Sequence, residues 1–409
     1  MPERLKKEWT RVAFGDVVVN RRDQIIDRVS AGIERIVGLE DLTSGDLRIQ
    51  SWKGIDGSPS FRTLFKPGQT LFGKRRAYLR KVAVANFEGL CTQNILVLES
   101  KHPDMLLPEL LPFLCSTDAF FEHAIATSEG SLFPNASWNA LAKYEFALPP
   151  MEEQRRIAEV LRAVQDCTET LELAIGRMSA VRNGFFTHLI LGPHASEFYG
   201  ELSNNLLPSE WRLVPVCELV SALITKGATP SAELKDVDTG IPFLKVYNLT
   251  FDGTLDFSID PTFITQAGHL ELQRSIVQPG DILMNIVGPP LGKVSLVPSG
   301  FPECNINQAI ARYRPVRDGL SMWLTRFMLS SLAQNWLAAR SKKTSGQRNL
   351  TLETCRELPV PVPPDNAIRE IMDQLAIIDA SLIGIKTRLV HVNSLRRNLM
   401  ETMLEIRGV

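Results

Sequence analysis

Two stretches of the chain decide the fold, LPPMEEQRRIAEVL at residues 148–161 and VPPDNAIREIMDQL at residues 362–375. Each opens with a double proline, which is tolerated only in the first turn of a helix and forces the preceding residue to be extended. Charged residues then alternate with apolar ones at helical spacing. The stretches therefore predict the starts of two helices, over residues 151–192 and 365–409.

Both predicted helices carry an apolar heptad repeat in the same register, 214 positions apart. The seam residues are Ile157, Leu161, Val164, Leu171, Ile175, Met178 and Phe185 in the first helix, and Ile371, Leu375, Ile378, Leu382, Ile385, Leu389, Val392 and Leu399 in the second. An amphipathic helix packed on a globular core is the alternative, but its stripe normally drifts at a period of 3.6 residues. We therefore expect the two helices to form a coiled coil.

The rest of the chain is also duplicated. EWTRVAFGDVV near residue 9 matches EWRLVPVCELV near residue 211, KPGQTL at 66–71 matches QPGDIL at 278–283, and TSEGSLFPN matches TSGQRN. Strand-like runs around turn signals precede a helical segment in each copy, PELLPFLCSTDAFFEHAIATS and LSMWLTRFMLSSLAQNWLAARSK. The prediction is a mixed α/β fold with domain 1 at residues 1–150, a linker at 193–209 and domain 2 at 210–364.

Matched seams predict that the helices pair antiparallel, so that the two halves are related by a pseudo-twofold axis. Arg182 and Arg396 occupy equivalent seam positions and need acidic neighbours. Asp379 and Asp166 lie within about one helical turn of the required places. We expect them to be the partners of these arginines.

Composition excludes several classes of protein. With 44% hydrophobic and 22% charged residues the chain is typical of soluble globular proteins, and no apolar run is long enough to span a membrane or to form a secretory signal, so we expect a cytoplasmic protein. The net charge of −1 excludes binding of nucleic acid through bulk charge, so any such site must be local.

No catalytic or metal-binding constellation is evident. The six cysteines lie far apart without a Cys-x-x-Cys pair, and the six histidines are scattered without ligand spacing. GPPLGKV at 288–294 fails as a phosphate loop, and Glu99-Ser100-Lys101 and Glu233-Leu234-Lys235 do not fall at equivalent places in the two copies. We expect a non-catalytic chain that holds no metal and no cofactor.

Two basic clusters are more informative. They suit DNA, because arginine, glutamine and asparagine match base edges in the major groove while lysines mostly hold phosphates. A solvated charged face is the alternative. The candidate DNA-binding residues are Lys74, Arg75, Arg76, Tyr78, Arg80 and Lys81 in domain 1, and Lys342, Lys343, Gln347, Arg348 and Asn349 in domain 2.

The duplicated order of a variable domain, a P-G-D-I-L or P-G-Q-T-L turn, a T-S-G-type loop and LPPMEEQRRI opening a heptad helix resembles the specificity subunit of type I restriction-modification enzymes. GKRRAYLRKVAV at 73–84 also looks like a segment common in the target-recognition domains of that family. The second helix departs from the pattern, because VPPDNAIREI lacks the Glu-Gln pair. The resemblance covers essentially the whole chain.

The resemblance implies a non-catalytic subunit whose two target-recognition domains each read one half of an interrupted DNA sequence, with the paired helices as a ruler. It implies two modification subunits that use S-adenosylmethionine to methylate adenine, and two restriction subunits that use ATP and Mg²⁺. The start of the first helix, with Glu152, Gln154, Arg155 and Arg156 on its solvent face, is where we expect a modification subunit to dock. A free-standing DNA-binding regulator and a coiled-coil scaffold remain the rival hypotheses.

Overall fold

The computed structural model describes residues 9–25, 32–54, 61–130, 134–192, 202–231, 235–344 and 347–404. Most of the predicted linker, residues 193–201, lies outside these ranges, as does the predicted end of the second helix after residue 404. By packing, the chain divides into two units. Unit 1 comprises Met1–Leu173 with Lys386–Val409, and unit 2 comprises Ala174–Ile385.

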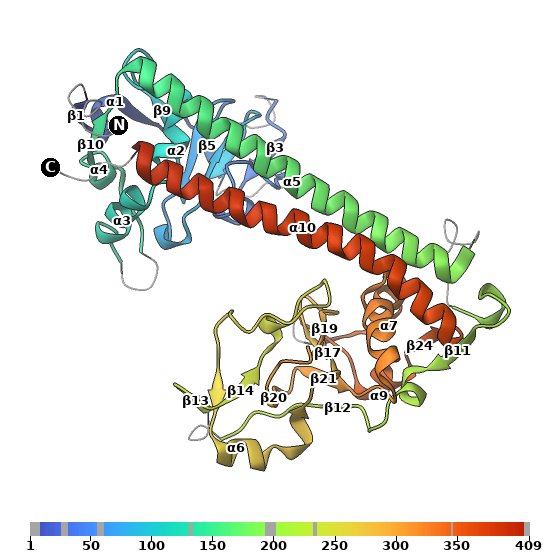
Figure 1. The fold of residues 1–409 in the computed structure, drawn as a ribbon. Helices are drawn as coiled ribbons and strands as arrows, with labels where there is room; N and C mark the ends of the chain where they lie inside the picture. The colour runs from blue at the N-terminus through green and yellow to red at the C-terminus, as the bar shows by residue number, and fades with distance from the viewer. Residues whose placement is uncertain are drawn as a thin grey trace. The chain divides into compact units, whose positions relative to one another are not determined.

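Two long helices dominate the chain, α5 at Met151–Leu191 and α10 at Asp365–Leu404 (Figure 1). Each unit holds the start of one helix and the end of the other. In unit 1 the start of α5 shares a core with Leu404 at the end of α10, and in unit 2 the start of α10 shares a core with Ile190 at the end of α5. The helices therefore pair antiparallel within each unit, which confirms the prediction.

Burial along the predicted seam is strongest where each helix starts. Ile157 and Leu161 are fully buried in unit 1, and Ile371 and Leu375 are buried in unit 2. Most of the remaining seam residues, such as Leu171 and Ile385, are only half-buried. The two hypotheses for the heptads are thus both partly right, because each helix pairs with the other and also begins inside the core of a globular domain.

The two seam arginines make different contacts. In unit 2, Arg182 Nη1 donates to Asp379 Oδ1 at 3.2 Å, and Arg326 donates to the other oxygen of the same carboxylate. In unit 1, Arg396 donates to Gln165 Oε1 at 2.7 Å and to the Gly45 carbonyl at 2.6 Å. Asp379 is therefore the partner of Arg182, as predicted. The prediction that Asp166 is the partner of Arg396 is wrong, because Asp166 is exposed and its neighbour Gln165 faces the seam.

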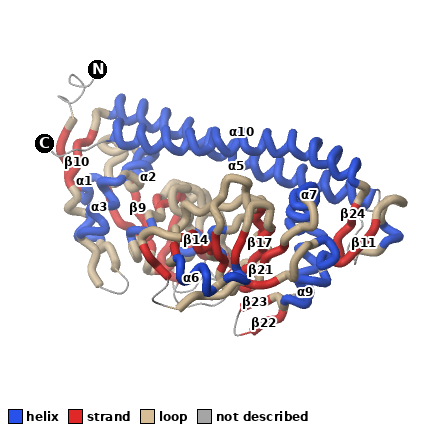
Figure 2. The backbone as a smooth tube through the Cα atoms, turned by 60° about the horizontal axis from the view of Figure 1, so that its bottom comes forward, coloured by secondary structure: helices blue, strands red, loops and turns tan. Residues whose placement is uncertain are grey.

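Domain 1 consists of two four-stranded sheets and an edge pair, with short helices beside them (Figure 2). The first sheet has the order β2 (Val18–Arg21), β9 (Ile95–Ser100), β6 (Thr70–Gly73), β7 (Val82–Val84), and the second β4 (Lys53–Gly54), β3 (Arg35–Val37), β8 (Gly89–Thr92), β5 (Phe61–Phe65). The edge pair is β1 (Thr10–Ala13) with β10 (Glu145–Leu148). The helices are α1 (Phe14–Val17), α2 (Leu111–Leu114), α3 (Asp118–Ala126) and α4 (Trp138–Leu141), with 3₁₀ turns η2 (Leu39–Asp41), η3 (Ala77–Leu79) and η4 (Pro108–Leu110).

Domain 2 repeats this topology. Its first sheet has the order β12 (Thr225–Lys226), β21 (Ile310–Tyr313), β17 (Ile282–Asn285), β19 (Val294–Leu296), and its second β13 (Lys235–Val237), β15 (Phe263–Ile264), β14 (Ile241–Leu244), β20 (Cys304–Ile306), β16 (Ile276–Val277). The edge pair is β11 (Arg212–Pro215) with β24 (Pro359–Val362), and a further sheet joins β18 (Val287–Gly288), β23 (Gln347–Asn349) and β22 (Lys342–Thr344). The helices are α6 (Gln266–Glu271), α7 (Asp318–Leu329), α8 (Ser331–Arg340) and α9 (Leu352–Glu357), with turns η6 (Asn204–Leu206), η7 (Val216–Leu219), η9 (Val246–Asn248) and η10 (Gln273–Ser275).

The matched turns of the sequence have the same geometry in both copies. Gly68 and Gly280 each adopt a φ of 87°, in the left-handed region that favours glycine. The residue after each glycine closes the turn with its side chain, since Gln69 accepts from Lys66 N at 2.7 Å and Asp281 accepts from Gln278 N at 2.9 Å. The mixed α/β fold and its duplication are therefore confirmed.

Each helical segment predicted as one helix before the T-S-G-type loop is in fact interrupted. In domain 1, α2 ends at Leu114 and α3 starts after Thr117, whose hydroxyl accepts from Phe120 N at 3.3 Å. In domain 2, Ser330 separates α7 from α8 and accepts from Ala333 N at 3.4 Å. The cause is that serine and threonine satisfy the free amides of a new helix start better than they continue a helix.

The seam contacts predict unequal stabilities for two substitutions. Asp379→Ala leaves two buried guanidinium groups without their carboxylate, and we expect the free energy of unfolding to fall by about 3 kcal/mol. Gln165→Ala removes one neutral acceptor, with a loss of about 1 kcal/mol. Urea unfolding measures both, and the exposed Asp166→Ala is the control. If Asp379→Ala were no more harmful than this control, the seam contact would not stabilise the helix pair.

Candidate nucleic-acid interface

The basic segment of domain 1 forms a loop that projects between β6 and β7, here called tongue 1 (residues 74–81). Its base is closed by Gly73 N donating to Lys81 O at 2.9 Å. Lys81 also donates from Nζ to the Leu39 carbonyl at 2.8 Å. The tongue is therefore fastened to the first sheet through its backbone and to turn η2 through a side chain.

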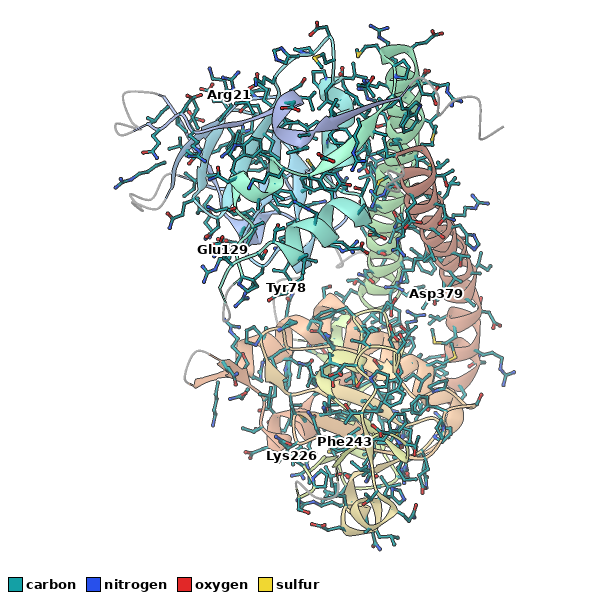
Figure 3. The ribbon with its side chains drawn as sticks, turned by 90° about the vertical axis from the view of Figure 1, so that its left-hand side faces the viewer. Arg21, Tyr78, Glu129, Lys226, Phe243 and Asp379 are labelled. Carbon is teal, nitrogen blue, oxygen red and sulfur yellow. The ribbon has the colours of Figure 1, made fainter. Side chains whose placement is uncertain are left out.

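A second loop, far away in the sequence, packs along tongue 1. Ala136 N donates to Lys74 O at 2.9 Å, and Arg76 N donates to Pro134 O at 2.7 Å. Arg75 forms a β-bridge with Asn135. This second loop belongs to the matched TSEGSLFPN segment, of which residues 131–133 lie outside the described ranges. Tyr78 and Glu129, one from each loop, lie at the same end of the domain in Figure 3.

Domain 2 builds the same arrangement from the equivalent positions. Tongue 2 (residues 286–293) is closed by Asn285 N donating to Lys293 O at 3.1 Å, and Lys293 Nζ reaches the Val246 carbonyl at 3.4 Å. The hairpin of β22 and β23 takes the place of the second loop, with Leu350 N donating to Ile286 O at 2.9 Å. The corresponding hydrogen bonds in domain 1 are Gly73 N to Lys81 O, Lys81 Nζ to Leu39 O, and Ala136 N to Lys74 O.

The two basic clusters of the sequence therefore lie on different elements of a site that occurs once in each domain. In domain 1 the tongue carries the cations, whereas in domain 2 the hairpin carries them. Arg75 and Glu129 face Asn135 in domain 1, and Val287 and Lys342 face the equivalent Asn349 in domain 2. The same place on a duplicated fold thus presents positive charge from different elements.

The predicted DNA-binding residues differ in their exposure to solvent. Tyr78 is exposed in domain 1, and Lys342, Gln347 and Arg348 are exposed in domain 2. Lys74, Arg75, Arg76 and Asn349 are partly buried. The side chain of Lys343 lies outside the described part of the structure.

Arg80 and Lys81 are held by side-chain contacts within domain 1. Arg80 pairs with Asp118 at the start of α3, and its guanidinium lies 5.4 Å from the ring centre of Phe121. Lys81 is held by the Leu39 carbonyl, as Lys293 is held by Val246. Arg80 and Lys81 therefore position the tongue, and the sequence pattern alone did not separate them from the other residues of the cluster.

The backbone of tongue 1 is strained. Arg76 and Arg80 adopt φ values of 54° and 50°, where an L side chain costs about 1–2 kcal/mol. At the position equivalent to Arg80, tongue 2 has Gly292 with a φ of 83°. The shape of the tongue is thus shared, and domain 1 keeps arginine where glycine fits more easily.

Sequence reasoning missed the residues that hold tongue 2. Asn285 is fully buried, donates to Pro290 O at 2.7 Å and accepts from Lys293 N at 2.7 Å. Gln334 on α8 donates to Gly292 O at 3.0 Å. The available signal was an asparagine inside an apolar strand, since a buried amide needs partners for all its groups.

Comparison with known proteins places the chain in a family. A sequence model described as the type I restriction modification DNA specificity domain matches residues 60–175 and 208–391, one stretch in each half. The chain belongs to this specificity-domain family. Both stretches contain a tongue and the first part of a long helix, so the family match covers the repeated site.

Individual relatives of this specificity-domain chain are distant. The EcoBI type I restriction enzyme specificity subunit of Escherichia coli is 25% identical over 309 residues, which are 69% of this chain and 64% of that protein. The putative MjaX specificity subunit of Methanocaldococcus jannaschii is 23% identical over 254 residues, 61% of this chain and 55% of that protein. The chain thus matches less than two thirds of the length of these relatives.

Solved structures share the fold. A chain from a structural study of complex assembly and conformational transition in the type I R-M system has a TM-score of 0.53 and 21% identity, with 100% of both chains covered. The S subunit of the type I restriction-modification system from M. genitalium has a TM-score of 0.51 and 15% identity, with 100% of this chain and 99% of that chain covered.

The start of α5 in this specificity-domain chain combines an exposed surface with a buried anchor. Glu152, Arg155 and Arg156 are exposed at the start of α5, as predicted. Gln154 is only 1% exposed, so its placement on the solvent face is wrong. It accepts from Leu107 N at 2.8 Å and donates to the carbonyls of Met105 and Pro149, which pins the loop before α2 to the helix start.

Each helix start of the specificity-domain chain also borders a groove. Arg155, Ala158 and Glu159 line a groove of about 450 Å³ in unit 1. Arg369 and Asp373, 214 residues after the first and last of these, line a groove of about 300 Å³ in unit 2. Among the described residues no cluster of three or more His, Cys, Asp or Glu side chains is placed to hold a metal, and no described helix is long and apolar enough to cross a membrane.

The strain in tongue 1 predicts an unusual order of stabilities. Arg80→Gly loses the exposed pair with Asp118 but removes the left-handed penalty, whereas Arg80→Ala loses the pair and keeps the penalty. We therefore expect Arg80→Gly to be about 1 kcal/mol more stable than Arg80→Ala in urea unfolding. At Arg75, whose φ is not positive, the order should reverse, with alanine the more stable by about 0.5–1 kcal/mol. The same order at both sites would argue against strain at Arg80.

Proposed function

We propose that this chain is a DNA-reading specificity subunit of a type I restriction-modification complex. Each domain reads one half of an interrupted DNA sequence with its tongue and the loop or hairpin beside it. The observation that carries the proposal is the pair of equivalent sites on a duplicated fold, each basic but with its cations on different elements. Such sites suit two half-sites of unlike sequence, because base readout depends on which side chains occupy a shared place.

The residues divide into two kinds of contact. In domain 1, Lys74, Arg75 and Arg76 flank the tip of the tongue and suit phosphates and base edges, while Arg80 and Lys81 position them. In domain 2, Gln347, Arg348 and Asn349 lie on one strand with bidentate side chains, and Lys342 and Lys343 lie on its neighbour. Lysine suits phosphate as a point charge, whereas arginine and the amides also match base edges.

In this proposal the partner subunits carry out the catalytic steps. Two modification subunits bind S-adenosylmethionine and methylate adenine, and two restriction subunits use ATP and Mg²⁺. Support comes from the family match and from the sequence, which has no phosphate loop and no glycine-rich cofactor loop. This chain is then a non-catalytic component that supplies sequence specificity, and the helix pair sets the gap between the half-sites.

Docking of the modification subunits is proposed at the two helix starts. The grooves beside Arg155 and Arg369 occupy equivalent positions, which suits two copies of one partner. The long helices also expose apolar side chains, with Val181 and Ile377 in unit 2 and Leu395 in unit 1, at 58%, 71% and 49% exposure. Large apolar side chains exposed along a helix favour a protein partner.

The rival hypotheses predict different binding. A free-standing regulator binds a specific DNA sequence without a methyltransferase, and a scaffold binds proteins but shows no salt-dependent DNA affinity. A specificity subunit binds DNA in a sequence-specific and salt-dependent way that strengthens when the modification subunits are present. Titration of labelled DNA with the chain, alone and with modification subunits, at several salt concentrations distinguishes the three.

Readout by domain 2 gives a direct prediction. Arg348→Ala should relax methylation at the second half-site only, with a cost of about 1–3 kcal/mol if the guanidinium contacts a base. If it contacts a phosphate, binding to every sequence should weaken and the salt slope should fall by about 1. Methylome sequencing and salt titration measure these effects, and Arg212→Ala on exposed strand β11 is the control. Relaxation of the first half-site would contradict the assignment of one half-site to each domain.

Docking gives a second prediction. Arg155→Glu should remove one modification subunit from the complex and Arg369→Glu the other, because each reversal places like charge beside Glu159 or Asp373 in its groove. The double variant should lose both. Native mass spectrometry counts the subunits, circular dichroism checks the fold, and Arg212→Glu is the matched control. A complex of unchanged composition in the double variant would exclude these grooves as docking sites.

A further inference from the structure

The tip of tongue 1 presents one aromatic ring to solvent. Turn η3 places Ala77 inward at 1% exposure and Tyr78 outward at 52% exposure. Within the part of the chain that the structure describes, the Tyr78 hydroxyl has no hydrogen-bond partner. Among residues 74–81, all of which the structure describes, Tyr78 is thus the one exposed residue.

The backbone that carries this ring is fastened at several points. Its first half is bonded to the loop at residues 134–136, and its base is closed between Gly73 and Lys81. Its second half is tethered by Arg80, which pairs with Asp118 and stacks on Phe121. The left-handed Arg76 and Arg80 lie directly on either side of η3, and strain of this kind persists only where surrounding contacts enforce it.

Tongue 2 is built with a different apolar tip. The closing bonds align Lys81 with Lys293, so Pro289 and Pro290 occupy the places of Ala77 and Tyr78, and both prolines are exposed. The buried side chain of Asn285 bonds the Pro290 carbonyl and so fixes this tip from below. Both domains thus expose apolar groups at the end of a fastened loop.

We propose that the Tyr78 ring stacks on a base of the first half-site, as an aromatic wedge at the tip of tongue 1. This inference rests on the proposed function and adds the mode of contact. Lys74, Arg75 and Arg76 precede the tip and place positive charge where a ring inserted among bases is flanked by phosphates. Cations beside an exposed aromatic ring are the combination by which proteins hold unstacked bases.

A base is a better occupant than a protein side chain for two reasons. The cations around Tyr78 attract a polyanion, and the fastened backbone beneath the ring gives the tip little freedom to adapt to a protein surface. A ring on a fastened loop loses less conformational entropy when it stacks than a ring on a mobile loop. Apolar side chains inserted between base steps open the step and kink the duplex, so the contact also predicts a local distortion of the DNA.

The test compares Tyr78→Ala, Tyr78→Phe and Tyr78→Leu in the full chain bound to its modification subunits. DNA carries the mapped recognition sequence with 2-aminopurine placed at successive positions of the first or second half-site. Affinity and 2-aminopurine fluorescence are measured at several salt concentrations. Trp52→Ala, which removes another exposed aromatic ring of domain 1, is the matched control.

Stacking predicts that Tyr78→Ala weakens specific binding on the order of 10- to 100-fold and leaves the salt slope unchanged, because no charge is lost. Tyr78→Phe should stay within about twofold of the natural protein, since the ring remains, and Tyr78→Leu should fall between them. An increase in 2-aminopurine fluorescence should appear in the first half-site only, and Tyr78→Ala should abolish it. Trp52→Ala should change neither readout.

Three results would overturn the inference. Normal affinity and fluorescence in Tyr78→Ala would show that the ring does not contact DNA, and equal loss in Tyr78→Phe and Tyr78→Ala would assign the contact to the hydroxyl. Loss of a modification subunit with unchanged DNA affinity of the remaining complex would assign Tyr78 to a protein interface. If the natural complex bound no DNA sequence specifically, the proposed function itself would fail, which is a distinct outcome.

Discussion

The burial of both ends of each long helix is the constraint on which the other features depend. Helix α5 starts in the core of unit 1 with Ile157 and Leu161, and its last residues, Ile190 and Leu191, are buried in the core of unit 2. Helix α10 does the reverse. Each domain core therefore contains the start of one long helix and the end of the other. Removing either helix would expose apolar surface in both domains. The same constraint explains why the seam is most deeply buried at the helix starts and only half-buried further along.

Duplication preserved the scaffold of the site and left its chemistry free to diverge. The closing bond of the tongue, the lysine that reaches a 3₁₀ turn and the bridge to an asparagine all recur in both domains. These contacts use backbone groups or side chains that face inward. Positions that face outward differ, since Arg75 corresponds to Val287 and Glu129 to Lys342. Two domains that bind different DNA sequences require a common backbone arrangement with different outward-facing side chains.

The helix pair diverged in a similar way at its buried polar positions. Asp379 balances Arg182 and Arg326 in unit 2, while the equivalent Gln165 gives Arg396 only a neutral acceptor. Burial therefore lowers the pKa of the Arg396 guanidinium, which donates to the Gln165 amide and the Gly45 carbonyl. Domain 1 also contacts α5 at a more exposed site, where Arg48 bonds Asp46 and pairs with Glu172. The Asp46 hydrogen bond is the main reason that the pKa of Arg48 is raised.

The sequence by itself determined the duplication, the two long helices, their antiparallel pairing and the mixed α/β class. These features follow from proline positions, heptad spacing and matched turns, which are one-dimensional signals. Only the tertiary structure decided that residues 74–81 and the strands at 342–344 and 347–349 belong to one kind of site, that Arg396 contacts Gln165 rather than Asp166, and that Gln154 is an anchor. The physical reason is that these outcomes depend on side-chain direction and on contacts between segments distant in the chain, where one residue's step along a helix or strand turns a side chain from solvent to core.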